Sequence, residues 1–171
     1  MSEVMVERSY PEPLSDEVLN RNLDAASPCL NLHRVTWRRS FLSLDRKELV
    51  CHFSARDAES VRIALQQAGA RRGLVWSCRI EDAPGMAEGD VQQAAVYACS
   101  ASPESDIVSA FEPDALCLVT HRVKTLRRYV SLDRRRLIAL YEAPDAESVR
   151  LALHGAGLQP EYVRAFSHLL P

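Results

Sequence analysis

HRVTWRRSFLSLDR, at residues 33–46, returns at residues 121–134 as HRVKTLRRYVSLDR. The similarity continues without a gap into a second shared stretch, DAESVR, at residues 57–62 and 145–150. At this offset of 88, 20 of the 38 positions from 33 to 70 are identical. Chance does not supply such a match, so the chain contains an internal duplication.

The duplication extends more weakly toward the N-terminus. There Val4–Arg8 aligns with Ala94–Ala98 at an offset of 90, which places Glu7 opposite Tyr97. A site that uses Glu7 is therefore expected in the first copy alone.

The chain of 171 residues divides naturally into two small units. Hydrophobic residues make up 47% and charged residues 26%, as in an ordinary globular protein, and the net charge is −2. We predict a first repeat at 1–81, a linker at 82–90 that contains Pro and Gly, and a second repeat at 91–171.

Each repeat is predicted to contain four strands and two helices. In the first repeat these are a strand at 3–9, a helix from the N-cap Ser15 to Pro28, strands at 34–43 and 48–54, a helix from the N-cap Asp57 to Gly69, and a strand at 74–80. This order, β-α-β-β-α-β, is typical of ferredoxin-like domains. Because one such unit leaves a sheet face uncovered, we expect an α+β fold of two tandem ferredoxin-like units packed sheet to sheet as a pseudo-dimeric sandwich or barrel.

Two arginines recur at equivalent positions of the second predicted strand. Simple alternation places Trp37 and Arg39 on one face of that strand, and Arg127 occupies the same position in the second copy. A buried guanidinium needs a partner, so we expect these arginines to hold a carboxylate such as Glu7 or a small anionic ligand. An internal structural ion pair is the alternative.

The cysteines point to a reduced, cytoplasmic protein. The five are unevenly spaced without a Cys-x-x-Cys pair, and the N-terminus lacks the pattern of a secretory signal. Cys51 and His52 are neighbours on a strand, so their side chains diverge. We include Cys51 and Trp37 among the candidate ligand-binding residues, with Glu7, Arg39 and Arg127.

Histidines precede the second strand in both copies, at His33 and His121. Two imidazoles related by a pseudo-twofold axis could share a divalent metal ion, with Glu7 as a further ligand. A surface position is the alternative for each.

The sequence lacks the motifs of several functional classes. There is no Gly-rich phosphate loop, nucleophile elbow or His-Glu-x-x-His zinc motif. Residues 121–136 carry seven Lys and Arg against one acid, but the third strand lacks the Gly-aromatic context of RNA-recognition domains. We expect neither a nucleic-acid nor a membrane partner.

The motifs of both copies resemble a family of small bacterial ferredoxin-like proteins of unknown function, some of whose members are named nickel-binding proteins. The matching residues are Val6-Glu7-Arg8, Trp37-x-x-Ser40-Phe41, Asp45, Cys51, the stretches 55–62 and 141–150, Ala68-Gly69 and Ala156-Gly157-Leu158. The resemblance implies units that pair face to face and, as cofactor, nickel or another divalent transition metal. For this chain it implies a homodimer or a monomeric pseudo-dimer.

Three functions follow from these patterns. The first is a small binding protein for a divalent transition metal or a small anionic ligand held between the repeats. The second is a cofactor-independent isomerase, cyclase or monooxygenase that uses a cavity there, an analogy of fold alone. The third is a structural module without a ligand. For the enzyme alternative, the sequence identifies no catalytic residues.

Overall fold

The chain divides into two units. The computed structural model describes residues 1–111 and 115–171. Unit 1 comprises residues 1–78 and 167–171, and unit 2 comprises residues 79–166.

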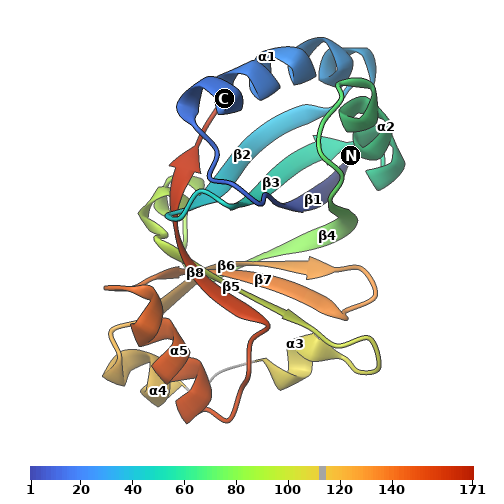
Figure 1. Ribbon diagram of the computed structural model, residues 1–171. Helices are drawn as coiled ribbons and strands as arrows, with labels where there is room; N and C mark the ends of the chain where they lie inside the picture. Colours follow the sequence, from blue (N-terminus) through green and yellow to red (C-terminus); the bar gives the residue numbers. More distant parts are fainter. Residues whose placement is uncertain (112–114) are drawn as a thin grey trace. The chain divides into compact units, whose positions relative to one another are not determined.

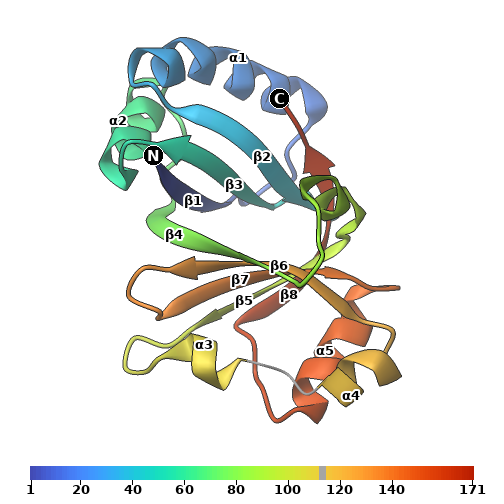
Figure 2. The same cartoon turned by 180° about the vertical axis from the view of Figure 1, so that it is seen from behind.

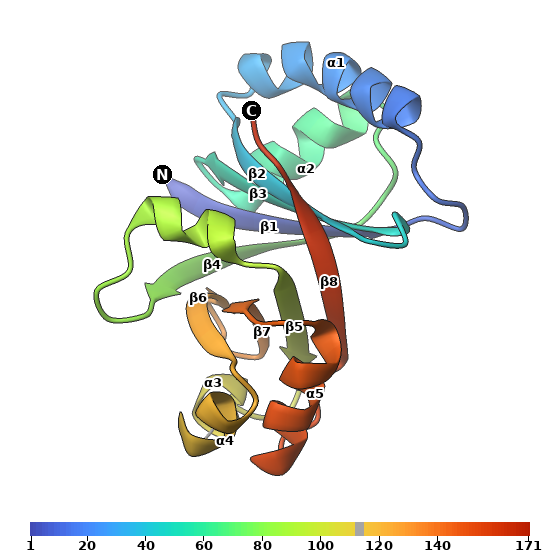
Figure 3. The same ribbon diagram turned by 90° about the vertical axis from the view of Figure 1, so that its left-hand side faces the viewer.

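The sheet of unit 1 has four antiparallel strands in the order β4–β1–β3–β2. Helices α1 and α2 cover the same face of this sheet (Figures 1 and 3). The elements are β1 Ser2–Ser9, α1 Asp16–Leu32, β2 Thr36–Ser43, β3 Glu48–Ala55, α2 Ala58–Gln67 and β4 Leu74–Asp82, of which residues 79–82 belong to unit 2. The predicted element order β-α-β-β-α-β is therefore confirmed for unit 1.

Unit 2 repeats the strand order as β8–β5–β7–β6, again antiparallel throughout (Figure 2). Its elements are the 3₁₀ helix η1 Glu88–Gln93, β5 Val96–Ala101, α3 Ile107–Ala110, α4 Ala115–Thr120, β6 Lys124–Ser131, β7 Arg136–Glu142, α5 Ala146–Gly155 and β8 Tyr162–Leu169. The fold is mixed α+β, as predicted.

The core of unit 1 lies between its helices and its sheet. Alternate residues of β1 and β3 point toward the helices, where they meet the buried faces of α1 and α2. The buried members are Val4, Val6, Leu19, Leu49, Cys51, Phe53, Val61, Ala64 and Leu65. Because side chains alternate along a strand, Arg8 lies on the same face as Val4 and Val6.

The helix boundaries follow local chemistry, with one exception. Ser15 and Asp57 are N-caps, as predicted, and Gly69 has a φ of +71° just after α2. The predicted end of α1 at Pro28 is wrong, because α1 continues to Leu32 with the exposed Pro28 inside it. A proline there removes one backbone hydrogen bond, and its solvent-facing position leaves water to satisfy the freed carbonyl.

Among the described residues, no helix has the length and apolar character needed to cross a membrane.

Arginine occupies the left-handed position of both hairpin turns. Arg46 has a φ of +62° and Arg134 a φ of +59°, a conformation that non-glycine residues seldom adopt. Arg46 Nη2 donates to Asp16 Oδ1 at 2.6 Å, and Arg134 Nε donates to Asp106 Oδ2 at 2.9 Å. Each turn is thus tied by an arginine to the start of the first α-helix of its unit.

A β-bulge changes the predicted faces of β2. Trp37 pairs with Phe53, but Arg39 already pairs with His52, so Arg38 is an extra residue. The prediction that Trp37 and Arg39 share a face is therefore wrong. Trp37 faces the helices with Phe53, and Arg39 faces the opposite side with His52.

The register also corrects the alignment of the first strands. Val6 pairs with Cys51 in unit 1, whereas Ala98 pairs with Ala139, the counterpart of Cys51, in unit 2. The offset there is therefore 92 (Val6 to Ala98) and not 90. Glu7 corresponds to Cys99 rather than Tyr97, and Arg8 corresponds to Ser100.

The N-cap of α2 predicts an acid-dependent part of the stability. Hydrogen bonds from the Ser60 hydroxyl and backbone N–H, together with Arg56, lower the pKa of Asp57 from 3.8 to about 2. Since the charged form is favoured in the folded state, this contribution is present above the ordinary pKa and is lost as the pH falls toward 2. We expect Asp57→Ala to lower the Tm at pH 7 by a few degrees.

Asp57→Asn is the matched control, because it keeps a capping oxygen and removes the charge. Thermal unfolding between neutral and acidic pH should show a smaller loss for Asp57→Asn than for Asp57→Ala at pH 7, and a weaker acid dependence than in the parent protein. Equal Tm values for all three proteins would contradict the capping role.

Candidate functional site

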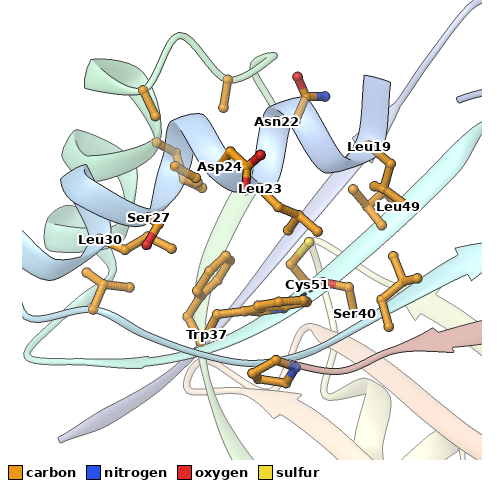
Figure 4. A pocket seen from close by; sticks show the side chains of 18 of the residues that line it. Leu19, Asn22, Leu23, Asp24, Ser27, Leu30, Trp37, Ser40, Leu49 and Cys51 are labelled. Atoms are coloured by element: carbon orange, nitrogen blue, oxygen red, sulfur yellow. Dashed lines mark hydrogen bonds between the residues drawn. The ribbon is translucent and has the colours of Figure 1, made fainter. Parts of the chain in front are cut away.

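A pocket of about 390 Å³ lies in unit 1 between α1 and the helix-covered face of the sheet. Figure 4 shows Trp37, Cys51 and Leu49 on the sheet side and residues of α1 on the other side. Its volume lies in the ~300–1,000 Å³ range of small-molecule sites, and its wall is mostly apolar. Further lining residues are Tyr10, Leu19, Leu23, Ala26, Leu30, Val35, Phe53, Leu65, Ala68 and Leu169.

A buried arginine lines this apolar pocket. Only 8% of Arg8 is exposed, and Arg8 Nη2 donates a hydrogen bond to Cys51 Sγ at 3.3 Å. Arg8 Nε is buried and has no hydrogen-bond partner among residues 1–111 and 115–171. Within the same described ranges, no carboxylate lies at ion-pair distance from this guanidinium. Such a group is costly to bury, because its charge is only partly compensated.

The neighbours of Arg8 nevertheless favour its charged form. Burial alone would lower the pKa of Arg8, but the Cys51 sulfur and the Tyr10 hydroxyl outweigh burial and raise it. Burial also raises the pKa of Tyr10, against the opposing influence of Arg8. The pocket therefore contains the positive charge of Arg8 beside the Cys51 sulfur and the Tyr10 hydroxyl.

Gly73 packs closely against Arg8 and the backbone of Glu7. A Cβ atom built on Gly73 would lie 2.3 Å from the Glu7 carbonyl oxygen and 2.5 Å from Arg8 Cγ. Because Gly73 has no side chain, the segment before β4 can pack directly against β1.

Helix α1 supplies the outer wall of the pocket. Leu19, Leu23 and Leu30 have the spacing of one helix face, and this face points toward the sheet (Figure 4). The exposed residues Asn22 and Asp24 belong to the rim. The pocket thus combines an apolar body, a polar rim and one buried cation.

Trp37 owes its place in the pocket to the β-bulge. The extra residue Arg38 turns Trp37 toward the helices, and Trp37 Nε1 donates to Ser40 Oγ at 2.9 Å. With its N–H satisfied inside the protein, the indole ring contributes apolar surface to the wall.

Two predicted ligand-binding residues lie on the other face of this sheet. Glu7 accepts a hydrogen bond from Trp76 Nε1 at 2.7 Å, and Arg39 is buried opposite His52 in the register. His52 Nε2 lies 2.5 Å from Glu3 Oε2. Neither Glu7 nor Arg39 lines the pocket, which brings together Trp37 and Cys51.

Arg127 belongs to an ion-pair cluster in unit 2. Its Nε lies 2.6 Å from Asp82 Oδ1 and its Nη2 lies 2.5 Å from Glu88 Oε2. Burial would lower the pKa of Arg127, but these hydrogen bonds raise it. Arg127 therefore forms an internal structural ion pair, which was the alternative considered from the sequence.

The three predicted metal ligands do not form a donor set. Within unit 1, Glu7 accepts from Trp76, and His33 Nε2 lies 2.8 Å from Gln67 Oε1. His121 follows α4 in unit 2. Across residues 1–111 and 115–171, no three His, Cys, Asp or Glu side chains are arranged to hold a metal ion. In these ranges the residues thus give no support to a nickel centre, and binding of nickel stays a prediction.

The sequence analysis did not identify Arg8 as a residue of the pocket, because arginine is seldom buried in a strand core. The signal was present in the alternation of β1, where Val4, Val6 and Arg8 share the core face. Tyr10 was missed because it follows the strand and no periodicity marks it.

Unit 2 lacks the polar groups of this pocket. Ser100 takes the position of Arg8 and Ala139 that of Cys51. Thr125 takes the position of Trp37, in front of an equivalent bulge. The two copies have therefore diverged at the candidate site while they kept the same strand register.

Comparison with known proteins gives one family match. Residues 5–76 match the family model described as "Nickel responsive protein SCO4226-like". The matched segment includes Arg8, Trp37 and Cys51. No curated protein matches the chain.

Solved structures resemble the chain in fold. A putative chlorite dismutase, TA0507, has a TM-score of 0.51 at 10% identity and covers 98% of this chain and 94% of its own. A putative monooxygenase from Lactobacillus acidophilus NCFM has a TM-score of 0.50 at 6% identity, with the same coverage. SCO4226 from Streptomyces coelicolor A3(2) aligns over 50% of this chain and 100% of its own, with a TM-score of 0.41 and 14% identity. Over residues 5–76, the chain is similar to the SCO4226-like nickel responsive proteins, which confirms the predicted family resemblance for the first copy.

Proposed function

We propose that unit 1 is a binding module for a small organic acid, whose apolar body fills the pocket under α1 and whose carboxylate pairs with Arg8. The observation that carries this proposal is the buried guanidinium in an apolar pocket, with Nε unpartnered among the described residues and with no acid beside it.

The chemistry of the guanidinium favours a carboxylate. Arginine presents parallel N–H donors that match the two oxygens of a carboxylate, and such charge-assisted bonds are stronger than neutral ones. A bound carboxylate would satisfy Nε and compensate the buried charge. A neutral ligand would leave that charge as it is, so the pocket should discriminate strongly between an acid and its ester.

The apolar wall favours a flat or extended hydrocarbon body. Trp37, Phe53 and the leucines of α1 offer this surface, and burial of apolar area contributes about 25 cal/mol per Å². Asp24 at the exposed rim disfavours a second negative charge at the mouth. The preferred ligand is therefore a monocarboxylate with one apolar end.

Other parts of the sequence-based interpretation stay predictions. These are the ferredoxin-like identity of both units, their sheet-to-sheet packing, a homodimer, binding of nickel, and the cofactor-independent enzyme. Two proteins of similar fold are described as a putative chlorite dismutase and a putative monooxygenase, so any acid that binds should also be tested for enzymatic turnover.

Calorimetric titration tests the proposed function. We expect aryl and alkyl monocarboxylates, 3-benzoylpropionate among them, to bind better than their methyl esters. Arg8→Ser should lower the affinity for the acids by roughly 10- to 100-fold and leave the affinity for the esters unchanged, since a hydrogen-bonded charge pair is lost. Serine is the residue that the second copy carries at this position, which favours a folded variant.

Arg39→Ser is the matched control. Arg39 is buried to a similar degree, at 6% exposed against 8% for Arg8, and lies on the opposite face of the sheet. This variant should keep the preference for acids. Equal affinity for acids and esters, or no binding of any acid up to ~10 mM, would contradict the proposal.

Gly73→Ala should impair the same site indirectly. The added methyl group collides with the Glu7 carbonyl and the Arg8 side chain, so we expect a loss of about 1–3 kcal/mol in the free energy of unfolding and weaker binding of acids. Urea unfolding and calorimetry measure the two effects. Gly89→Ala is the control, because nothing lies within 4 Å of its added Cβ. Parent-like stability of Gly73→Ala would refute this packing.

A further inference from the structure

The thiol of Cys51 lies beside the group that would hold the ligand. Arg8 Nη2 donates to Cys51 Sγ at 3.3 Å, and both residues line the pocket. Cys51 is 3% exposed, and Figure 4 shows its sulfur directed toward α1, across the space of the pocket. A molecule that reaches Arg8 through the pocket therefore reaches this sulfur as well.

The guanidinium also supports the charge that a reacting thiol develops. A thiolate is the nucleophilic form of cysteine, and a neighbouring arginine stabilises its negative charge.

Two other cysteines have the opposite surroundings. Burial, together with the charge of Glu3, raises the pKa of Cys78 to about 12. Cys99 Sγ lies 3.8 Å from Glu161 Oε2. A neighbouring carboxylate disfavours a second negative charge, and the raised pKa of Cys78 makes its thiol a poor nucleophile.

We propose that Cys51 is a covalent acceptor for electrophilic organic acids, which Arg8 holds by their carboxylate. This inference rests on the proposed function and narrows its ligand class to α,β-unsaturated carbonyl compounds that carry a carboxylate. The sulfur forms a bond to the alkene carbon β to the carbonyl, the π bond of the alkene breaks, and the proton from the thiol ends on the α carbon. Addition needs no oxidant or leaving group.

The second copy shows that the two groups are not required by the fold. Ser100 and Ala139 stand where unit 1 has Arg8 and Cys51, in the same strand register. The variants Arg8→Ser and Cys51→Ala therefore place in unit 1 residues that the same strands already carry in unit 2.

The test uses trans-3-benzoylacrylate and its methyl ester on the full chain. Peptide mass spectrometry follows the gain of one whole reagent at each cysteine over time, and rates are divided by those of glutathione with the same reagent. We expect Cys51 to react at least ~10-fold faster with the acid than with the ester, because Arg8 binds the acid. Cys29 and Cys117, which are half-buried, serve as internal references without this preference.

Variants identify the residues responsible. Arg8→Ser should abolish the preference for the acid at Cys51, Arg39→Ser should keep it, and the saturated 3-benzoylpropionate should protect Cys51 from the reagent. Cys51→Ala should lose the fast adduct, while Cys29 and Cys117 react as in the parent protein.

The outcomes separate this inference from the proposed function. If 3-benzoylpropionate binds in an Arg8-dependent manner but Cys51 forms no adduct faster than Cys29, the covalent role is wrong and the binding role stands. If 3-benzoylpropionate shows no Arg8-dependent binding and Cys51 reacts equally with acid and ester, both are wrong.

Discussion

The contact between the Arg8 guanidinium and the Cys51 sulfur dominates the chemistry of unit 1. Both groups come from core-facing positions of neighbouring strands, where the surrounding residues are aliphatic or aromatic. A charge in such a place costs free energy unless it is paired, and a thiol with a tyrosine hydroxyl compensates it only in part. The protein tolerates this cost at a position where its own second copy carries serine. We interpret the cost as the consequence of a site that is complete only with an anion bound.

Duplication followed by divergence explains why the pocket belongs to one unit. Strand order, helix caps and the arginines of the hairpin turns are common to both copies, because these features fix the backbone. The polar residues of the pocket are not common to both. The first copy keeps the arginine, the thiol and the tryptophan on a long helix-covered face, whereas serine, alanine and threonine replace them in the second. The shared features support folding, and the unshared ones support binding.

The sequence predicted the features of the fold that depend on local chemistry. Ser15 and Asp57 as N-caps and the β-α-β-β-α-β order of elements in unit 1 follow from residue type and alternation. The bulge at Arg38 could not be predicted, because an extra residue in a strand changes the faces without altering the composition. The offset of the first strands was wrong for a related reason: only the pairing with β3 and β7 fixes which residues correspond.

In the candidate site, Trp37 and Cys51 were identified from sequence, but Arg8 was not, since burial of a charged residue contradicts the usual preference. Glu7, Arg39 and Arg127 were selected as polar residues on strands, and their partners or faces place them elsewhere.

The resonance of the Arg8 Nε–H group in a ¹⁵N-correlated NMR spectrum tests the central claim most directly. The resonance is assigned by its absence from the spectrum of Arg8→Ser. In the free protein this proton has no acceptor among the described residues. Titration with 3-benzoylpropionate should move it downfield, as expected for a new hydrogen bond to a carboxylate, while the methyl ester should leave it in place. An unchanged Arg8 signal at saturating acid, or equal shifts with acid and ester, would contradict the account.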